Sequence, residues 1–168
     1  YREFDSMLEF AVSWEGPVAI RYPRGYMDEY INNSSKGINL GKGCLVEKGE
    51  DITIAAAGKM VKTALNVRKI LKEENIEAEV LNLRFIKPID NELILKSVDK
   101  TKKLVLIDEA AKYSSFAFNI LSMLPRNVDV LIKTLPDSFI EQGSIEELLK
   151  DNKLDAGSIA ADIIKWRV

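Results

Sequence analysis

The sequence predicts an α/β domain of three layers, helix–sheet–helix, around a mostly parallel five-stranded sheet with one antiparallel edge strand. Strand-like and helix-like segments alternate from residue 44 to the end of the chain. Residues 51–58, DITIAAAG, are apolar nearly throughout, as expected of a strand covered on both faces. Such alternation implies right-handed crossovers between parallel strands, with helices packed on both sides of the sheet.

The N-terminal segment precedes this alternation. Residues 3–14 are predicted to form a helix, because apolar side chains recur at helical spacing: Phe4, Leu8, Ala11 and Val12. The residues EGP end it, and the β-rich run PVAIRY (17–22) predicts a strand that stops at Pro23. The following stretch, 24–43, is rich in Gly, Asn and Ser without a period, and we interpret it as a connection.

The elements of the alternating part follow in order. Strands are predicted over 44–49, 51–58, 78–85, 102–109 and 128–135, and helices over 59–74, near 114–124 and over 156–167. The strand at 44–49 comes before any helix of this part, so it is placed antiparallel at an edge. Asp90 is a predicted N-cap after the turn at Pro88, and Ser144 with Glu147 forms the S-x-x-E capping box of another helix.

Composition limits the classes of function. The 168 residues suffice for one domain with a full core, or for one domain and part of another. The formal net charge of −2 and a pI of about 5.4 argue against a general nucleic-acid binder, which needs a basic surface. Apolar runs stay well short of the ~20 residues that cross a bilayer. The opening residues, YREFDSMLEF, show no signal peptide and no initiator Met, so we expect a piece of a longer protein. A single cysteine, Cys44, fits a reducing cytoplasm.

The chain contains no histidine. Histidine is the usual general base near neutral pH and a frequent metal ligand. Its absence removes Ser-His and Cys-His nucleophile pairs and makes a zinc site improbable beside one cysteine. We therefore expect no complete catalytic apparatus and no zinc site in this chain.

Weaker candidates each have a structural alternative. Gly58 lies between a strand and a helix, where a phosphate can bind, but a single glycine outside any phosphate-binding motif favours a tight turn. Asp108 and Glu109 end a strand, where ligands bind in open α/β sheets, so the pair could bind a metal or transfer protons. A helix cap or a contact with a partner's donors is the favoured interpretation. The segment 135–144 is interpreted as a loop that docks Phe139 and Ile140 on the core, and Cys44 as a small buried apolar side chain.

Arg24 is the more balanced case. Pro23 cannot continue a hydrogen-bonded ladder, and Gly25 lets the chain turn away at once. A guanidinium held by a rigid backbone loses little entropy on binding, and its planar donors suit phosphate or carboxylate. From the residues alone, anion binding and a structural ion pair remain open for Arg24, with a plain surface position behind them.

Five segments, in order, carry a family resemblance: GPVAIRYPRG, DITIAAAGKMVKTAL, LRFIKPID, VLIDE and LPDSFIEQGSIEEL. Together they resemble the C-terminal part of the 1-deoxy-D-xylulose-5-phosphate synthases, thiamine-diphosphate enzymes of the transketolase superfamily. The resemblance covers essentially the whole chain, and RYPRG combined with LPD-x-F-I-x-x-G-S is its most specific part. Other members of the superfamily, a transketolase or a 2-oxo-acid dehydrogenase beta subunit, remain alternatives, as does a non-catalytic interaction module on the same fold.

The resemblance implies a domain layout and a reaction. Residues 1–30 resemble the last helix and strand of a pyrimidine-binding domain, 31–36 a linker, and 37–168 a transketolase-type C-terminal domain. The family joins pyruvate to glyceraldehyde 3-phosphate with loss of CO₂, for isoprenoid and thiamine precursors, in a cytoplasmic homodimer. Thiamine diphosphate, Mg²⁺ and the catalytic residues are implied to belong to the preceding part of the polypeptide, so that this chain alone is inactive. Nucleic acid and membrane are not implied partners.

By the same resemblance, Arg24 matches the arginine that grips the phosphate of the aldehyde acceptor. Arg21 matches no such residue and is expected to form a structural pair. One departure is visible at Ser114–Ala117, which reads SSFA where the family usually has a Gly-Gly-Phe-Gly-like run. Serine and alanine disfavour positive φ. Either the helix there starts without special geometry, or the chain is a diverged paralogue.

Overall fold

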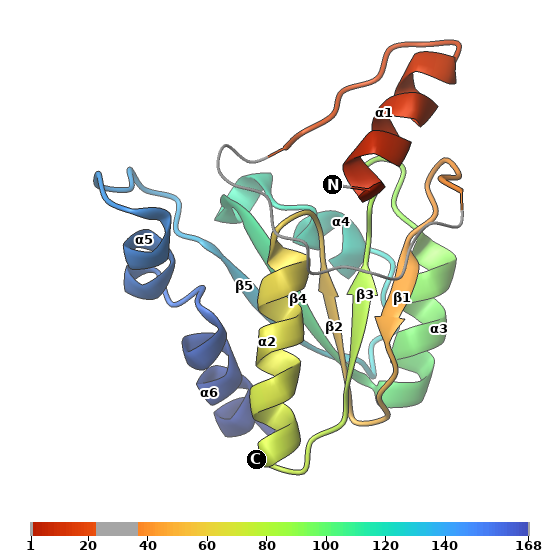
Figure 1. The fold of residues 1–168 in the computed structure, drawn as a ribbon. Helices are drawn as coiled ribbons and strands as arrows, with labels where there is room; N and C mark the ends of the chain where they lie inside the picture. Colours follow the sequence, from red (N-terminus) through yellow and green to blue (C-terminus); the bar gives the residue numbers. More distant parts are fainter. Residues whose placement is uncertain (1, 23–36, 168) are drawn as a thin grey trace.

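A five-stranded sheet forms the centre of the molecule in a computed structural model that describes residues 2–22 and 37–167 (Figure 1). The strands are β1 (Cys44–Glu47), β2 (Ile52–Ala56), β3 (Ala78–Asn82), β4 (Lys103–Ala111) and β5 (Asp129–Leu135). Their order is β1-β3-β2-β4-β5; β1 runs antiparallel to β3 at one edge, and the other pairs are parallel. The predicted fold class, including the antiparallel edge strand, is confirmed.

Helices cover both faces of the sheet (Figure 1). They are α1 (Arg2–Ser13), α2 (Met60–Glu73), α3 (Asn91–Thr101), the 3₁₀ turn η1 (Lys112–Ser114), α4 (Ala117–Leu121), α5 (Ile145–Asp151) and α6 (Ala156–Arg167). One core cluster joins the sheet to α2 and α6, and a second joins it to α3 and α4. α1 stands apart from both layers, beyond the ends toward which β2 and β3 run (Figure 1).

The central strand β2 shows how the sequence pattern produces these layers. Its side chains alternate between the faces, so Ile52, Ile54 and Ala56 pack in the α2–α6 core while Ala55 packs in the α3–α4 core. All five residues of the strand are buried. Burial of each large aliphatic side chain contributes about 1.5–3 kcal/mol, which is why a strand with two covered faces reads as one continuous apolar run.

Both predicted caps are present. Asp90 Oδ1 accepts the Leu93 backbone N–H at 3.1 Å, and its Oδ2 accepts the N–H of Gly43 at 3.0 Å. The one carboxylate therefore starts α3 and fixes the residues that enter β1. Ser144 and Glu147 form the reciprocal capping box at the start of α5.

Two predicted elements differ in the structure. Residues 17–22 form no strand, because a strand needs a neighbour for its ladder and these residues pair with none of the five strands. The helix predicted near 114–124 is reduced to η1 and the short α4, separated by Ser115 in an extended conformation (φ −72°, ψ 145°). The proposed domain boundaries at 30 and 36 lie outside the described residues and stay a prediction. None of the described helices is long and apolar enough to span a membrane.

Candidate functional site

Charged side chains gather at the carboxyl ends of β2, β3 and β4, the edge where ligands bind in open α/β sheets. This carboxyl edge carries Lys59 after β2, Arg84 after β3, and Asp108 and Glu109 near the end of β4. Two further residues, Glu3 and Arg21, reach it from the N-terminal segment. The structure thus brings the predicted pair Asp108–Glu109 together with cations that are distant in sequence.

Asp108 is the buried acid of this edge, with 3% of its side chain exposed. Its Oδ2 accepts the backbone N–H of Phe116 at 3.3 Å, just before α4. Its Oδ1 accepts a hydrogen bond from Arg21 Nη2 at 3.3 Å. The expectation that Arg21 forms a structural pair is confirmed. Asp108 holds the N–H of the residue before α4, but it does not cap α4 itself.

Glu109 points the other way and forms an ion pair with Lys59, the residue after the turn glycine Gly58. Gly58 has φ +57°, a left-handed conformation that favours glycine, so the tight-turn interpretation of this position holds. The turn places the Lys59 ammonium against the Glu109 carboxylate. Because the Glu109 carboxylate neutralises the Lys59 ammonium, Lys59 is a poor candidate for binding a phosphate.

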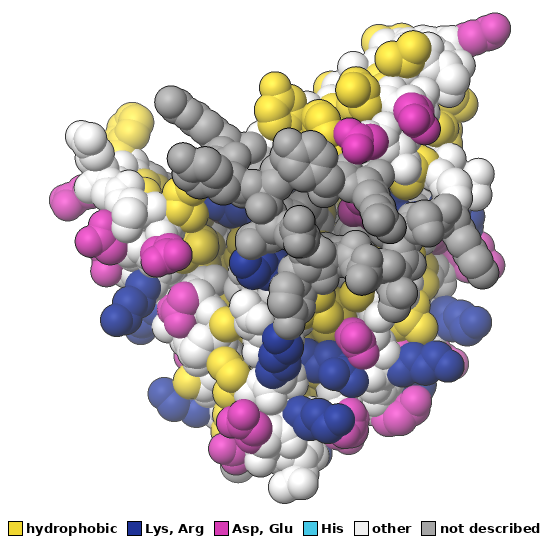
Figure 2. Space-filling model, viewed as in Figure 1, with side chains coloured by type: hydrophobic (Ala, Val, Ile, Leu, Met, Phe, Trp, Pro, Cys, Tyr) yellow, Lys and Arg dark blue, Asp and Glu magenta, His cyan; other side chains and the backbone are white. Residues whose placement is uncertain are grey.

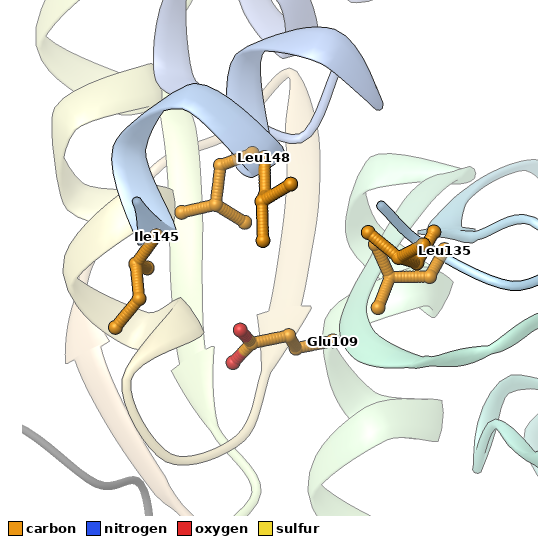
Figure 3. A pocket seen from close by; sticks show the side chains of 6 residues that line it. Glu109, Leu135, Ile145 and Leu148 are labelled. Atoms are coloured by element: carbon orange, nitrogen blue, oxygen red, sulfur yellow. The ribbon is translucent and has the colours of Figure 1, made fainter. Parts of the chain in front are cut away.

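A hollow of about 220 Å³ opens beside Glu109, between the end of β5 and α5 (Figure 3). The Glu109 carboxylate points into this hollow. The rest of its wall is apolar and consists of Leu135, Ile140, Ile145, Leu148 and Leu149. Ile140 lines this hollow, whereas Phe139 is fully exposed. The expectation that Phe139 and Ile140 dock on the core is therefore wrong: Ile140 is exposed and belongs to neither core cluster. The chain leaves β5 at Pro136 and carries residue 139 away from the sheet before α5 returns.

A second cluster on the carboxyl edge was not predicted. Asn82 Nδ2 donates to both carboxylate oxygens of Glu3, at 3.1 and 2.9 Å, and Arg84 Nε donates to Glu3 Oε1 at 2.7 Å. Asn82 and the Arg84 side chain are buried, and Arg84 adopts φ +55°, which is uncommon for a non-glycine residue. Glu3 lies about 80 positions before Asn82 and Arg84, so no local sequence pattern predicts these contacts.

The Glu3 cluster fastens α1 to the sheet while leaving much of the apolar face of α1 uncovered. Figure 2 shows apolar side chains gathered over α1 at the top of the molecule. Large apolar residues exposed on α1 and just after it are Phe4, Leu8, Val12, Trp14 and Val18. A helix of this kind suits contact with further protein surface.

Cys44 is half-buried at the start of β1, so its interpretation as a fully buried apolar side chain is only partly right. Burial raises the pKa of its thiol above the usual range; Arg84 acts in the opposite direction and Glu3 in the same direction. A raised pKa lowers the thiolate fraction at neutral pH, which disfavours a nucleophilic role.

The departure at Ser114–Ala117 has a simple local geometry. Ser115 and Phe116 have φ of −72° and −60°, and none of residues 114–117 has a positive φ. The Phe116 N–H is held by Asp108, and the Ala117 N–H by Ser115 Oγ at 3.1 Å. The helix here starts without special geometry, as the first alternative predicts; the local geometry has no bearing on the second.

Arg24 lies outside the described residues. Among the residues that are described, no group of three carboxylate, thiol or imidazole side chains converges to hold a metal ion. The carboxyl edge is therefore a surface of paired charges, on which the N-terminal segment is fixed by Glu3 and Arg21.

Comparison with known proteins places the chain. It is 36% identical over 166 residues to the 1-deoxy-D-xylulose-5-phosphate synthase of Heliobacterium modesticaldum, covering 94% of this chain and 25% of that protein. The synthase of Caldanaerobacter subterraneus is 38% identical, with 97% and 27% covered. The chain thus spans about a quarter of the length of these curated relatives, in their C-terminal region.

Solved structures agree on the fold. A chain described as "Split gene transketolase, inactive beta4 tetramer" superimposes with a TM-score of 0.87 at 28% identity, covering 98% of this chain and 54% of that one. A transketolase of Pichia stipitis superimposes with a TM-score of 0.53 at 16% identity over 74% of this chain, which supports the fold alone. Residues 41–159 match the family described as "Transketolase, C-terminal domain", and the chain belongs to that family.

Proposed function

We propose that this chain is the C-terminal part of a 1-deoxy-D-xylulose-5-phosphate synthase, which condenses pyruvate with glyceraldehyde 3-phosphate and releases CO₂. The observation that carries the proposal is similarity to such synthases over 94–97% of the chain, including residues before the C-terminal domain family match begins. In this proposal α1 and residues 14–30 complete a pyrimidine-binding domain, residues 31–36 form a linker, and residues 37–168 form the C-terminal domain. The exposed apolar face of α1 supports this layout, because it offers a surface for the rest of such a domain.

Arg24 is proposed to bind the phosphate of the aldehyde acceptor. Arg21 is engaged by Asp108, which leaves Arg24 as the arginine of the RYPRG segment to which the resemblance assigns the phosphate. A guanidinium suits a phosphate because its donors can pair with two oxygens at once. The C-terminal domain itself is proposed to support the other domains and the dimer.

The described residues do not fit a thiamine-diphosphate and Mg²⁺ site. They offer no converging acidic cluster, and the acids of the carboxyl edge are engaged by Arg21, Arg84, Lys59 and backbone N–H groups. In the proposal both groups belong to the remainder of the enzyme, which is cytoplasmic and homodimeric. The cofactor supplies the carbanion chemistry, and the protein binds and orients the substrates.

The purified 168-residue chain is expected to be inactive. With pyruvate, glyceraldehyde 3-phosphate, thiamine diphosphate and Mg²⁺, we expect no release of CO₂ above the rate without protein, because the chain contributes neither cofactor-binding nor catalytic residues. A coupled CO₂ assay checks this, with a complete synthase as the positive control. Turnover by the chain alone would refute the proposed division of labour.

A transketolase is the second candidate, favoured by the superposition on the split-gene transketolase. The two candidates differ in the donor substrate. Assayed with glyceraldehyde 3-phosphate as common acceptor, the complete polypeptide that carries this chain is expected to use pyruvate and to release CO₂. Activity with a ketose phosphate donor, without CO₂, would instead identify a transketolase.

A further inference from the structure

The turn that follows β3 presents two buried donors at one point. Asn82 is 1% exposed, and 6% of the Arg84 side chain is exposed. The Arg84 backbone N–H donates to Asn82 Oδ1 at 3.1 Å, which fixes the amide with its Nδ2 facing the Glu3 carboxylate. The Leu83 N–H donates to the Ala56 carbonyl at 2.9 Å and ties the same turn to β2. Residues 82–84 therefore hold these donors in place through their own contacts with the sheet.

The kind of donor and its burial indicate what this turn can bind. A guanidinium keeps its charge when it is buried, so Arg84 needs acceptors, and an anion is the best of them. A charged guanidinium and a side-chain amide that donate to the same group suit the two oxygens of a carboxylate. The turn also lies at the carboxyl end of β3, where ligands bind in open α/β sheets. Position and chemistry thus both favour a site for a carboxylate.

Glu3 of α1 occupies these donors in the structure. Asn82 Nδ2 lies 3.1 and 2.9 Å from its two carboxylate oxygens, and Arg84 Nε lies 2.7 Å from Oε1. The Glu3 side chain is 27% exposed, so water reaches it from outside. Phe10, two helical turns further along the same face of α1, packs edge-on against Phe85 with ring centroids 5.8 Å apart. Residues 82–85 therefore receive α1 through one polar and one apolar contact.

We propose that Asn82 and Arg84 form a carboxylate-binding site at the end of β3, and that Glu3 is its tethered ligand. A small free carboxylate binds the same donors once the Glu3 carboxylate is removed. The alternative is that Glu3 serves only the positive end of the α1 dipole, as Asp5 in the same first turn also can. In that case the contact with Arg84 is incidental, and Glu3 and Asp5 are equivalent. The proposal does not rest on the reaction of the complete polypeptide.

The test uses the ¹⁵N-labelled 168-residue chain, the variant Glu3→Ala, and sodium acetate as the probe at neutral pH. The side-chain amide resonances of Asn82 are followed by NMR, with sodium chloride at equal ionic strength as the reference. In Glu3→Ala they are expected to shift saturably, with half-saturation at about 5–100 mM acetate, the affinity that one charge-assisted pair supplies. In the unmodified chain the tethered Glu3 competes at high effective concentration, so half-saturation is expected to need at least about tenfold more acetate.

Two further variants make the result specific. Asp5→Ala removes the same charge from the same turn of α1, at an exposed residue, and is expected to respond to acetate as the unmodified chain does. Glu3→Ala/Arg84→Gln keeps a side chain of similar length at position 84 but removes the guanidinium. It is expected to lose the saturable shift, because the amide of Asn82 alone supplies no charge.

Each outcome decides for or against the site. A folded Glu3→Ala chain without a saturable shift of the Asn82 amide overturns the proposal. Equal responses of Glu3→Ala and Asp5→Ala, or the same shift with chloride, overturn it as well, as does a shift that survives Arg84→Gln. Should the double variant fail to fold, the comparison of Glu3→Ala with Asp5→Ala decides. Should Glu3→Ala fail to fold, Glu3→Gln, which keeps the length of the side chain without its charge, is titrated in its place.

Discussion

Replacement of Arg24 by alanine in the complete enzyme is expected to raise the KM for glyceraldehyde 3-phosphate by roughly 10- to 150-fold, the equivalent of one charge-assisted contact of about 1.5–3 kcal/mol. The KM for pyruvate, which has no phosphate, is expected to change much less. Steady-state kinetics with each substrate varied in turn measure both values. In the proposed role of Arg24, alanine would leave the acceptor phosphate without a bidentate cation.

The matched control is Arg126→Ala. Arg126 is an exposed arginine in the connection between α4 and β5, so its loss changes the net charge equally without touching the carboxyl edge. It is expected to leave the acceptor KM unchanged. Lysine at position 24 is expected to recover part of the affinity, since it restores the charge but not the planar pair of donors. An acceptor KM that is unchanged in Arg24→Ala would show that another group binds the phosphate.

The fold was predictable because its signals are local. The continuous apolar run at 52–56 indicates a strand with two covered faces, and the polar side chains of Asp90 and Ser144 indicate where two helices begin. Each of these local patterns predicts a single helix or strand, or the position where it begins. Together they fix the layers and leave few topologies open, because parallel strands need right-handed crossovers.

The errors come from contacts with distant residues. Residues 17–22 have the composition of a strand, but the ladder that a strand needs has to be supplied by neighbours that are absent from the described structure. The helix near 114–124 is cut short where Ser115 becomes extended and the Phe116 N–H turns to Asp108. The spacing of apolar residues along the sequence cannot predict such contacts with distant residues.

The site was predictable only in part for the same reason. The position of Asp108 and Glu109 after a strand indicated the carboxyl edge, but nothing in the sequence tells which acid is buried and which pairs with Lys59. The Glu3–Arg84 contact joins residues 81 positions apart. The structural pair expected for Arg21 is present in its contact with Asp108, but that expectation rests on the family resemblance and not on the residues around Arg21.

Replacement of Gly49 by alanine is expected to destabilise the chain strongly. The glycine is buried in the connection between β1 and β2, against the start of β3. A Cβ built there would lie well inside 3.0 Å of backbone atoms of Glu77, Ala78 and Glu79. Because backbone atoms cannot rotate away as a side chain can, Gly49→Ala is expected to lower the free energy of unfolding of the chain by about 3 kcal/mol or more. Urea unfolding followed by circular dichroism measures the change.

Two other glycines make the comparison specific. A Cβ on Gly37 or on Gly58 meets no atom within 4 Å, but Gly58 has φ +57° whereas Gly37 has no positive φ. Gly37→Ala is expected to change the free energy of unfolding by less than about 1 kcal/mol, and Gly58→Ala to lower it by about 1–2 kcal/mol through backbone strain. Unfolding of Gly49→Ala at the same urea concentration as Gly37→Ala would show that the connection can move away from β3.

Several hydrogen bonds hold the connection between β1 and β2 in place, so we expect that it cannot move away from β3. The N–H groups of Glu50 and Asp51 both donate to the Glu77 carbonyl at 3.0 Å, and the Gly49 carbonyl accepts Lys100 Nζ at 2.6 Å. Lys100 also pairs with the buried acid Glu79 at 2.8 Å. A shift of Gly49 that made room for a methyl group would stretch these bonds together and weaken the partner of a buried carboxylate. Glycine is required at this position by close approach and not by an unusual φ, so a sequence that reads EKGED indicates only a turn.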